Sequence, residues 1–213
     1  MNTPKAALPA LLLAALLAGC AGSAAPPHYY RLALNTPGAQ PETAPPAAAP
    51  ARAGAWVLQL PVRMPEYLER DALWLPTGGS DLVPLSDQRW AEPLRDAVPR
   101  LLRHDLAQLL GADRVWNGSA PAGLPVAGQL KLELLALEAM PERTGVRLSA
   151  RWSLVDPLNR QPPQIGQADL VAPSAGPSPS QLVDAHRLAL WQLAQQLARS
   201  LPAFGPVNPV NPV

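Results

Sequence analysis

Hydrophobic and polar residues alternate along two stretches in the second half of the chain, residues 126–137 and 145–155. Alternation of this kind places successive side chains on opposite faces of a strand, so both stretches are predicted to be β-strands. The short connection 138–144 indicates that they pair antiparallel. A third strand is predicted at 164–171, after the turn-forming sequence Asp156-Pro157-Leu158-Asn159.

Two longer stretches have the apolar spacing of amphipathic helices. In residues 91–110 leucine and valine recur at helical spacing, Pro93 lies in the first turn, where proline is tolerated, and Gly111 is a natural stop. Pro99 is expected to kink this helix or to shift its start. Residues 181–200 carry a second apolar stripe, which consists of Leu182, Ala185, Ala189, Leu193 and Leu197.

Shorter strand-like segments occupy the first half of the chain. Residues 28–34 and 56–60 are aromatic and aliphatic, and we expect them to pair with each other. Residues 72–75 and 81–85 flank the Gly-containing segment 76–80, which is typical of a β-hairpin. The first half therefore predicts two strand pairs.

The order of these elements favours an α/β (α+β) fold, in which a mixed, largely antiparallel β-sheet is covered by two main α-helices in a single domain. This domain spans residues 28–201. Residues 35–54 are rich in Pro and Ala and form an insertion, which as a random coil spans on the order of 25 Å. The tail 202–213 repeats Pro-Val-Asn and is expected to be disordered or extended.

Cys20, the only cysteine, follows the small-residue exit Leu17-Ala18-Gly19. Before it, Lys5 leads an uncharged stretch from residue 6 to 17, which is the pattern of a secretory signal peptide and too short to span a bilayer. The exit resembles a bacterial lipobox, and the alternative is a plain secreted protein with a stray cysteine. The resemblance implies that residues 1–19 are removed and that Cys20 carries a diacylglyceryl group and an amide-linked acyl chain such as palmitate.

A residue with three acyl chains anchors a protein permanently, because each buried methylene contributes about 0.8 kcal/mol and one chain binds only reversibly. Residues 20–27 then form a short tether between the membrane and the domain. The protein is expected to be anchored to a membrane without spanning it, with its body in the periplasm or outside the cell. Because acylation consumes the only thiol, no disulfide is expected.

The charge balance argues against nucleic acid as a partner. The chain has 17 Lys and Arg and 16 Asp and Glu residues, and its only lysines are Lys5 and Lys131. Removal of Lys5 with the signal peptide brings the net charge near zero, with no basic stripe. Nucleic-acid binding, which depends on neutralising many phosphates, and a polybasic membrane patch therefore have no support.

No catalytic or metal-binding motif stands out, so the protein is not expected to be an enzyme or to need a cofactor beyond the covalent lipid on Cys20. His28, His104 and His186 are scattered and are interpreted as surface or interface groups. Glu133 and Glu138 point to opposite faces of one strand, so they do not form a facing pair.

Basic and aromatic residues leave two interpretations open. Arg147 and Arg151 share a strand face and could bind phosphate head groups, although a solvated face paired with Glu133 is the favoured alternative. The six tryptophans are expected mostly in the core, with Trp74 beside the exposed hairpin as a contact residue.

The chain resembles the PqiC/YmbA-like lipoproteins, auxiliary components of ABC-type or MCE-type envelope transport. After the lipobox, the resemblance rests on the order and spacing of short motifs: Tyr29-Tyr30-Arg31-Leu32, Leu60-Pro61-Val62, Pro65-Glu66-Tyr67-Leu68-Glu69-Arg70 and Trp90-Ala91-Glu92-Pro93-Leu94. It implies a mixed α/β fold and an outer-membrane lipoprotein facing the periplasm, which works with an MCE-domain membrane protein that carries lipid and so supports membrane integrity. Ala21 is not the aspartate that commonly retains such lipoproteins in the inner membrane, which agrees with this placement.

Three functions follow from these observations. The first is a non-enzymatic docking subunit, whose candidate partner contacts are Tyr67, Leu68, Arg70 and Trp74. A homo-oligomer would suit such a subunit. The second is a lipid-binding lipoprotein that carries cargo in its own cavity, which requires an apolar pocket too large for side chains to fill. The third, a cell-wall or lipid hydrolase, lacks a nucleophile, a metal cluster and facing carboxylates.

Overall fold

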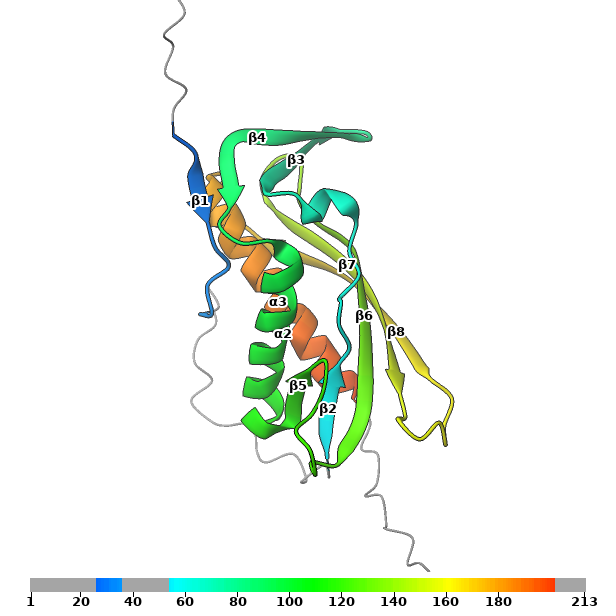
Figure 1. The fold of residues 1–213 in the computed structure, drawn as a ribbon. Helices are drawn as coiled ribbons and strands as arrows, with labels where there is room; N and C mark the ends of the chain where they lie inside the picture. Colours follow the sequence, from blue (N-terminus) through cyan, green and yellow to red (C-terminus); the bar gives the residue numbers. More distant parts are fainter. Residues whose placement is uncertain (1–25, 36–53, 202–213) are drawn as a thin grey trace, which may run out of the picture.

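The computed structural model describes residues 26–35 and 54–201 (Figure 1). The predicted signal peptide, Cys20 and most of the tether lie outside the described residues, as do residues 36–53 of the insertion and the tail 202–213. The described elements, in chain order, are β1 His28–Tyr30, β2 Ala55–Leu58, η2 Glu66–Glu69, β3 Ala72–Gly78, β4 Asp81–Trp90, α2 Leu94–Leu110, η3 Ala112–Arg114, β5 Val115–Asn117, β6 Val126–Ala139, β7 Gly145–Val155, β8 Gln164–Pro173 and α3 Pro179–Ser200.

The larger of two sheets has five strands in the order β5-β2-β6-β7-β8. The strands β6, β7 and β8 form an antiparallel meander, whereas β2 runs parallel to both of its neighbours. The alternation of residues 145–155 predicted β7 with its observed bounds, and the pairing of β6 with β7 is confirmed. The predicted fold class, an α+β single domain with a mixed sheet and two main helices, is confirmed as well.

A second, three-stranded sheet has the order β1-β4-β3 and lies at the end of the molecule where α3 begins (Figure 1). The strands β3 and β4 form the predicted hairpin. The expected pairing of residues 28–34 with 56–60 is wrong, because β1 pairs parallel with the end of β4 while β2 lies in the other sheet. Tyr30 is opposite Trp90, so a distant strand supplies the partner that β1 requires.

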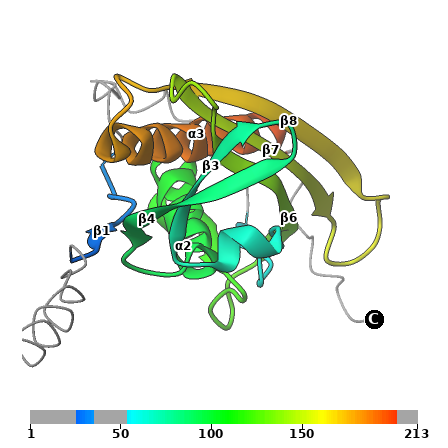
Figure 2. The ribbon, with the colours of Figure 1, turned by 90° about the horizontal axis from the view of Figure 1, so that it is seen from above.

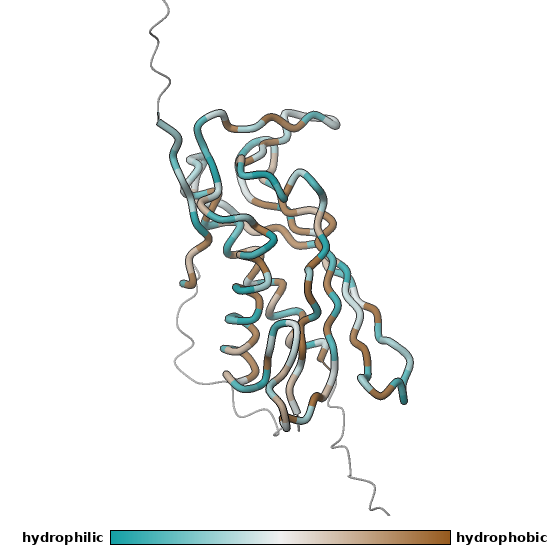
Figure 3. Tube along the Cα trace, viewed as in Figure 1, coloured by the Kyte–Doolittle hydropathy of each residue, from teal (hydrophilic) through white to brown (hydrophobic). Residues whose placement is uncertain are grey.

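The helices α2 and α3 pack together against one face of the five-stranded sheet (Figures 1 and 2). The core is mainly aliphatic and includes the buried rings of Trp56, Trp90 and Trp152, and apolar positions recur along both layers (Figure 3). Even-numbered residues of β7 face this core, and the odd-numbered Arg147 and Arg151 face solvent. The outer face of β7 is therefore polar, as strand alternation predicted.

The helix α2 begins at Leu94, directly after Pro93, and contains Pro99 in its interior. Pro99 therefore neither ends the helix nor shifts its start, and its buried ring contributes to packing. Gly111 terminates the helix with φ of 110°, a conformation that favours glycine, and donates its N–H to the carbonyl of Ala107. At α3, Ser178 and Gln181 form a capping box that fixes the start of the helix.

Two tryptophan rings cover glycines on neighbouring strands of the large sheet. Trp152 is directly opposite Gly166, and a Cβ atom at Gly166 would lie 2.4 Å from the Trp152 ring. Trp56 covers Gly128 of the adjacent strand in the same way, also at 2.4 Å. Both glycines are needed because the backbone and an aromatic ring approach closely there.

Candidate functional site

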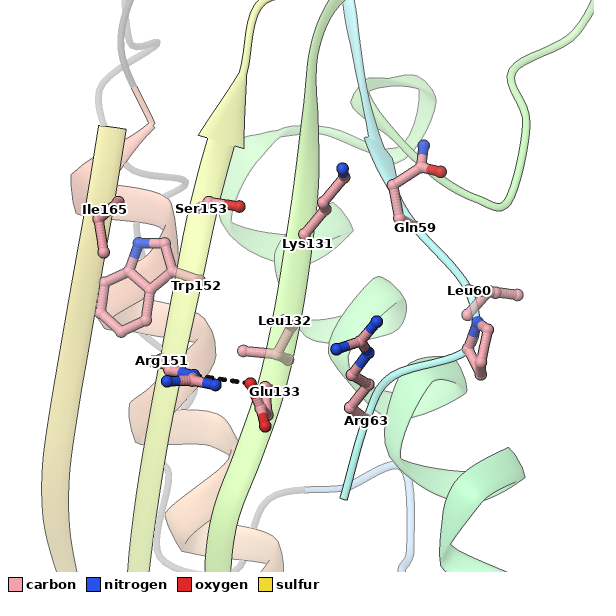
Figure 4. Close-up of a pocket in the computed structure, with 11 residues that line it drawn as sticks. Gln59, Leu60, Arg63, Lys131, Leu132, Glu133, Arg151, Trp152, Ser153 and Ile165 are labelled. Atoms are coloured by element: carbon pink, nitrogen blue, oxygen red, sulfur yellow. Dashed lines mark hydrogen bonds and ion pairs between the residues drawn. The ribbon is translucent and has the colours of Figure 1, made fainter. Parts of the chain in front are cut away.

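The outer face of the five-stranded sheet holds a groove of about 610 Å³. It runs between the segment after β2 and strands β6, β7 and β8, with the helices behind the sheet (Figure 4). The groove is lined by Gln59, Leu60, Pro61, Arg63, Lys131, Leu132, Glu133, Arg151, Trp152, Ser153 and Ile165.

Charged side chains form the floor of this groove. Arg151 Nε donates to Glu133 Oε2 at 2.6 Å, across the β6–β7 pair. The prediction that this arginine pairs with Glu133 on a solvated strand face is therefore confirmed. Arg63 and Lys131 line the same groove, and neither side chain forms a hydrogen bond or ion pair with any described residue. The groove thus contains one ion pair and two cationic side chains that have no partner among the described residues.

The segment that follows β2 is held to β6 by its backbone. The Gln59 N–H donates to Leu130 O at 2.8 Å, the Arg63 N–H donates to Leu132 O at 3.3 Å, and the Leu134 N–H donates to Arg63 O at 2.8 Å. A cis peptide bond joins Leu60 to Pro61 within this segment. The wall of the groove is therefore part of the sheet's hydrogen-bond network, and Arg63 is fixed relative to Lys131.

A second hollow of about 470 Å³ adjoins the groove along the same segment. It shares Pro61, Arg63 and Glu133 with the groove and extends to Glu69 and Arg95. Glu69 is the last residue of η2, so the predicted contact segment borders this hollow. The two hollows and η2 therefore form one continuous surface.

The four predicted partner contacts occupy different environments. Arg70 is exposed and forms a surface ion pair with Glu66 at 3.2 Å. Leu68 is only 5% exposed and packs in the core, so it supports η2 and presents no surface to a partner. Tyr67 and Trp74 are half-buried, and both line one small hollow. Arg70 is thus the most accessible of the four.

Tyr67 is held by the β6 strand. Its hydroxyl donates to Glu138 Oε2 at 3.5 Å, and burial, followed by the nearby Glu138 charge, raises the pKa of the Tyr67 phenol to about 12. The hydroxyl is therefore neutral across the physiological pH range and acts as a packing and hydrogen-bonding group.

His186 is buried, which corrects the interpretation of this histidine as a surface or interface group. Its Nδ1 lies 2.7 Å from Leu182 O, and its ring meets Trp90 edge to face with 5.4 Å between centroids. Burial lowers the pKa of His186 to about 4, against a smaller opposing effect of the Leu182 carbonyl. The imidazole is therefore neutral at pH 7 and belongs to the core.

A fully buried ion pair between the two helices was not predicted. Arg187 of α3 and Asp105 of α2 are 1% and 0% exposed, and their bidentate contacts measure 2.8 and 2.6 Å. Arg187 also donates from Nε to Ala33 O at 2.7 Å and from a terminal nitrogen to Leu34 O at 2.9 Å. One arginine therefore joins α2, α3 and the segment that follows β1.

The sequence contains a signal for this pair. Asp105 falls between Leu102 and Leu106 on the buried stripe of α2, and Arg187 falls between Val183 and Leu190 on that of α3. Opposite charges at core positions of two helices indicate a buried pair, because an unpaired charge is too costly to bury. Burial raises the pKa of Asp105, against the lowering effect of the Arg187 hydrogen bonds and charge.

In residues 26–35 and 54–201 no three His, Cys, Asp or Glu side chains are grouped so that they could hold a metal ion. None of the helices in this described part is long and apolar enough to cross a membrane.

Comparison with known proteins supplies the family context. The family model described as the ABC-type transport auxiliary lipoprotein component matches residues 34–198. No curated protein sequence matches the chain. A crystal structure of an uncharacterized protein is similar with a TM-score of 0.62 and 19% identity, covering 82% of this chain and 98% of that chain. A Xanthomonas campestris protein of the DUF330 family is similar with a TM-score of 0.64 and 11% identity, covering 80% and 92% respectively. At these identities the two structures show a shared fold.

Proposed function

The chain belongs to the family of ABC-type transport auxiliary lipoprotein components, and from this premise we propose that it is a non-enzymatic docking subunit of an MCE-type intermembrane lipid transport system. It is anchored to the outer membrane through acylated Cys20, and its body faces the periplasm. There it receives an MCE-domain membrane protein and so supports membrane integrity. The description of the family as an auxiliary component supports a role without catalysis.

The attachment of β1 is the observation that carries this proposal. β1 pairs with the end of β4, and Arg187 binds the carbonyls of Ala33 and Leu34. The chain is therefore fixed to the body from His28 onward. Only eight residue steps separate Cys20 from His28, which span at most about 28 Å when fully extended. Because the insertion follows this fixed point, its length does not increase the distance that the body can move from the membrane.

A short tether favours a docking subunit over a protein that carries lipid between membranes. A body held within about 28 Å of its anchor cannot leave one membrane to deliver cargo to another, so the partner must come to it. The groove also supports this reading, because it is open on the sheet surface rather than enclosed by apolar side chains. A carrier with its own cavity remains the alternative, and it requires a chamber that surrounds the lipid.

Site-specific photocrosslinking in intact envelopes tests the docking role. A photoreactive amino acid at Arg70 reports on the surface formed by η2 and the two hollows. The same amino acid at Leu158 is the matched control, because Leu158 is 56% exposed in the turn between β7 and β8. We expect an MCE-domain protein to be captured from Arg70 and not from Leu158. Capture of only outer-membrane barrels or cell-wall enzymes at both positions overturns the proposal.

A further inference from the structure

The groove on the outer face of the five-stranded sheet carries more positive charge than it neutralises. Arg63, Lys131 and Arg151 contribute three cations, and Glu133 contributes one carboxylate. Glu133 is already bound by Arg151 at 2.6 Å. The remaining two cations face one opening and have no anionic partner in residues 26–35 and 54–201. The groove is thus complementary to an anion.

These two cations are held by rigid backbone. Lys131 lies within β6, opposite Ser153 of β7. Arg63 is joined to both Leu132 and Leu134 by backbone hydrogen bonds and forms a parallel bridge with Glu133. Figure 4 shows Arg63 and Lys131 on the groove side of their two segments. Their Cα positions are therefore set before any ligand binds, which lowers the entropy cost of binding.

Apolar side chains border the cations on both sides. Ile165 of β8 is 84% exposed, and Leu60 on the opposite wall is 48% exposed. Both line the same groove, together with Pro61. An exposed isoleucine beside unpaired cations suits an amphipathic ligand, because such a ligand has an anionic group and an adjoining hydrocarbon part.

We propose that this groove binds the phosphate of a glycerophospholipid, with Arg63 and Lys131 contacting the phosphate oxygens. The glycerol and the first acyl carbons lie against Leu60 and Ile165. The volume of about 610 Å³ is that of a small-molecule site, so the distal acyl carbons extend beyond it. This inference deepens the proposed docking function, on which it rests, by placing a lipid contact next to the surface assigned to the partner. An acidic peptide is the competing occupant.

A titration of purified protein with a soluble lipid tests the proposal. The chain carries Cys20→Ser so that no acyl anchor contributes, and the probe is phosphatidylglycerol with six-carbon chains below its micelle concentration. Chemical-shift changes in ¹H–¹⁵N spectra at near-physiological salt give both affinity and location. We expect saturable shifts at Lys131, Arg151 and Ile165, and at least a tenfold loss of affinity in the R63Q/K131Q double variant.

Two matched variants separate the groove from general surface charge. Arg147→Gln removes a cation from the same sheet face but outside the groove, and we expect its affinity to stay within twofold of the parent. Ile165→Ser should weaken lipid binding while leaving the weak binding of glycerol 3-phosphate unchanged. The spectra themselves report whether each variant is folded, so a loss of binding is assigned to the site.

Each contrary outcome has a defined meaning. Equal affinity for glycerol 3-phosphate and the lipid reduces the groove to a phosphate site and overturns the lipid assignment. Tighter binding of an oligoglutamate peptide, with displacement of the lipid, assigns the groove to a protein segment instead. Absence of shifts, or shifts unaffected in R63Q/K131Q, removes the site altogether. Because the titration contains no partner, its failure leaves the crosslinking test of docking untouched.

Discussion

At the scale of single residues, Arg187 joins both helices to the segment that follows β1. Its guanidinium binds both carboxylate oxygens of Asp105 and the carbonyls of Ala33 and Leu34. Replacing either partner of the pair leaves the other as a buried unpaired charge. The pair therefore makes the attachment of the N-terminal segment depend on the packing of the two helices.

We expect Arg187→Gln to lower the free energy of unfolding by about 3–5 kcal/mol, which is the usual cost of breaking a buried pair. Combining Asp105→Leu with Arg187→Met removes both charges and should recover part of that loss. Urea unfolding measures each value. Glu66→Ala is the control, since it breaks the exposed pair with Arg70 and should cost less than about 1 kcal/mol. A loss below 1 kcal/mol for Arg187→Gln contradicts the assigned role.

His186 makes stability depend on pH. Its folded-state pKa of about 4 lies below the unfolded value of 6.5, so the unfolded chain binds the extra proton between these values. The stabilisation is complete above pH 6.5 and is lost as the pH falls toward 4. Lowering the pH from 7.5 to 5 should therefore reduce the free energy of unfolding by about 2 kcal/mol through His186 alone.

Urea unfolding of the parent and of His186→Phe at both pH values isolates this contribution. Because other carboxylates titrate in both proteins, the comparison uses the difference in pH dependence rather than the stability itself. The phenylalanine variant should show a smaller loss on acidification, by about 2 kcal/mol. Equal pH dependence of the two proteins means that His186 does not carry the effect.

At the scale of elements, local patterns predicted what local contacts determine. The antiparallel pair of β6 and β7 followed from alternation and a short connection, and α2 ended where Gly111 indicated. The partner of β1 could not be found this way, because β1 pairs with a strand some sixty residues later. β5 was missed because three residues are too few to show a period.

The candidate site was less predictable than the fold, for a similar reason. The Arg151 pair with Glu133 was foreseen, since both residues lie on neighbouring predicted strands. The contribution of Arg63 to the groove depends on how the segment after β2 lies against β6, which no local pattern shows. Leu68 was chosen as a contact, although its apolar side chain is what anchors η2 to the core.

The contact between Trp152 and Gly166 gives a prediction for the edge of the large sheet. Gly166→Val places a branched side chain where a Cβ atom already lies 2.4 Å from the ring. Displacing Trp152 should cost about 1–3 kcal/mol, as overpacking usually does. Gln167→Val is the matched control, because it puts the same side chain on the exposed face of the same strand. Similar unfolding midpoints for the two variants would show that the ring moves freely.

At the scale of the whole molecule, the attachment of β1 divides the two linkers into different roles. In the proposed lipoprotein, the tether 20–27 lies between the anchor and the body, whereas the insertion 35–54 begins after the point where Arg187 binds Leu34. Lengthening the tether should therefore move the body away from its membrane. Lengthening the insertion should not, because both of its ends join the same body, and a longer loop costs only about 0.6 kcal/mol per doubling.

Twenty Gly and Ser residues added after Ala25 or after Ala47 test this difference. Leu158→Cys provides the labelling site, because the proposed acylation of Cys20, the only native cysteine, leaves no competing thiol. In reconstituted vesicles, energy transfer from a dye at position 158 to a lipid dye reports the height of the body. The tether variant should increase the mean height by roughly 13 Å, because a random coil grows as the square root of its length, and the insertion variant should leave it unchanged. Equal increases for both would mean that β1 separates from the body at the membrane, which would remove the geometric basis of the docking proposal.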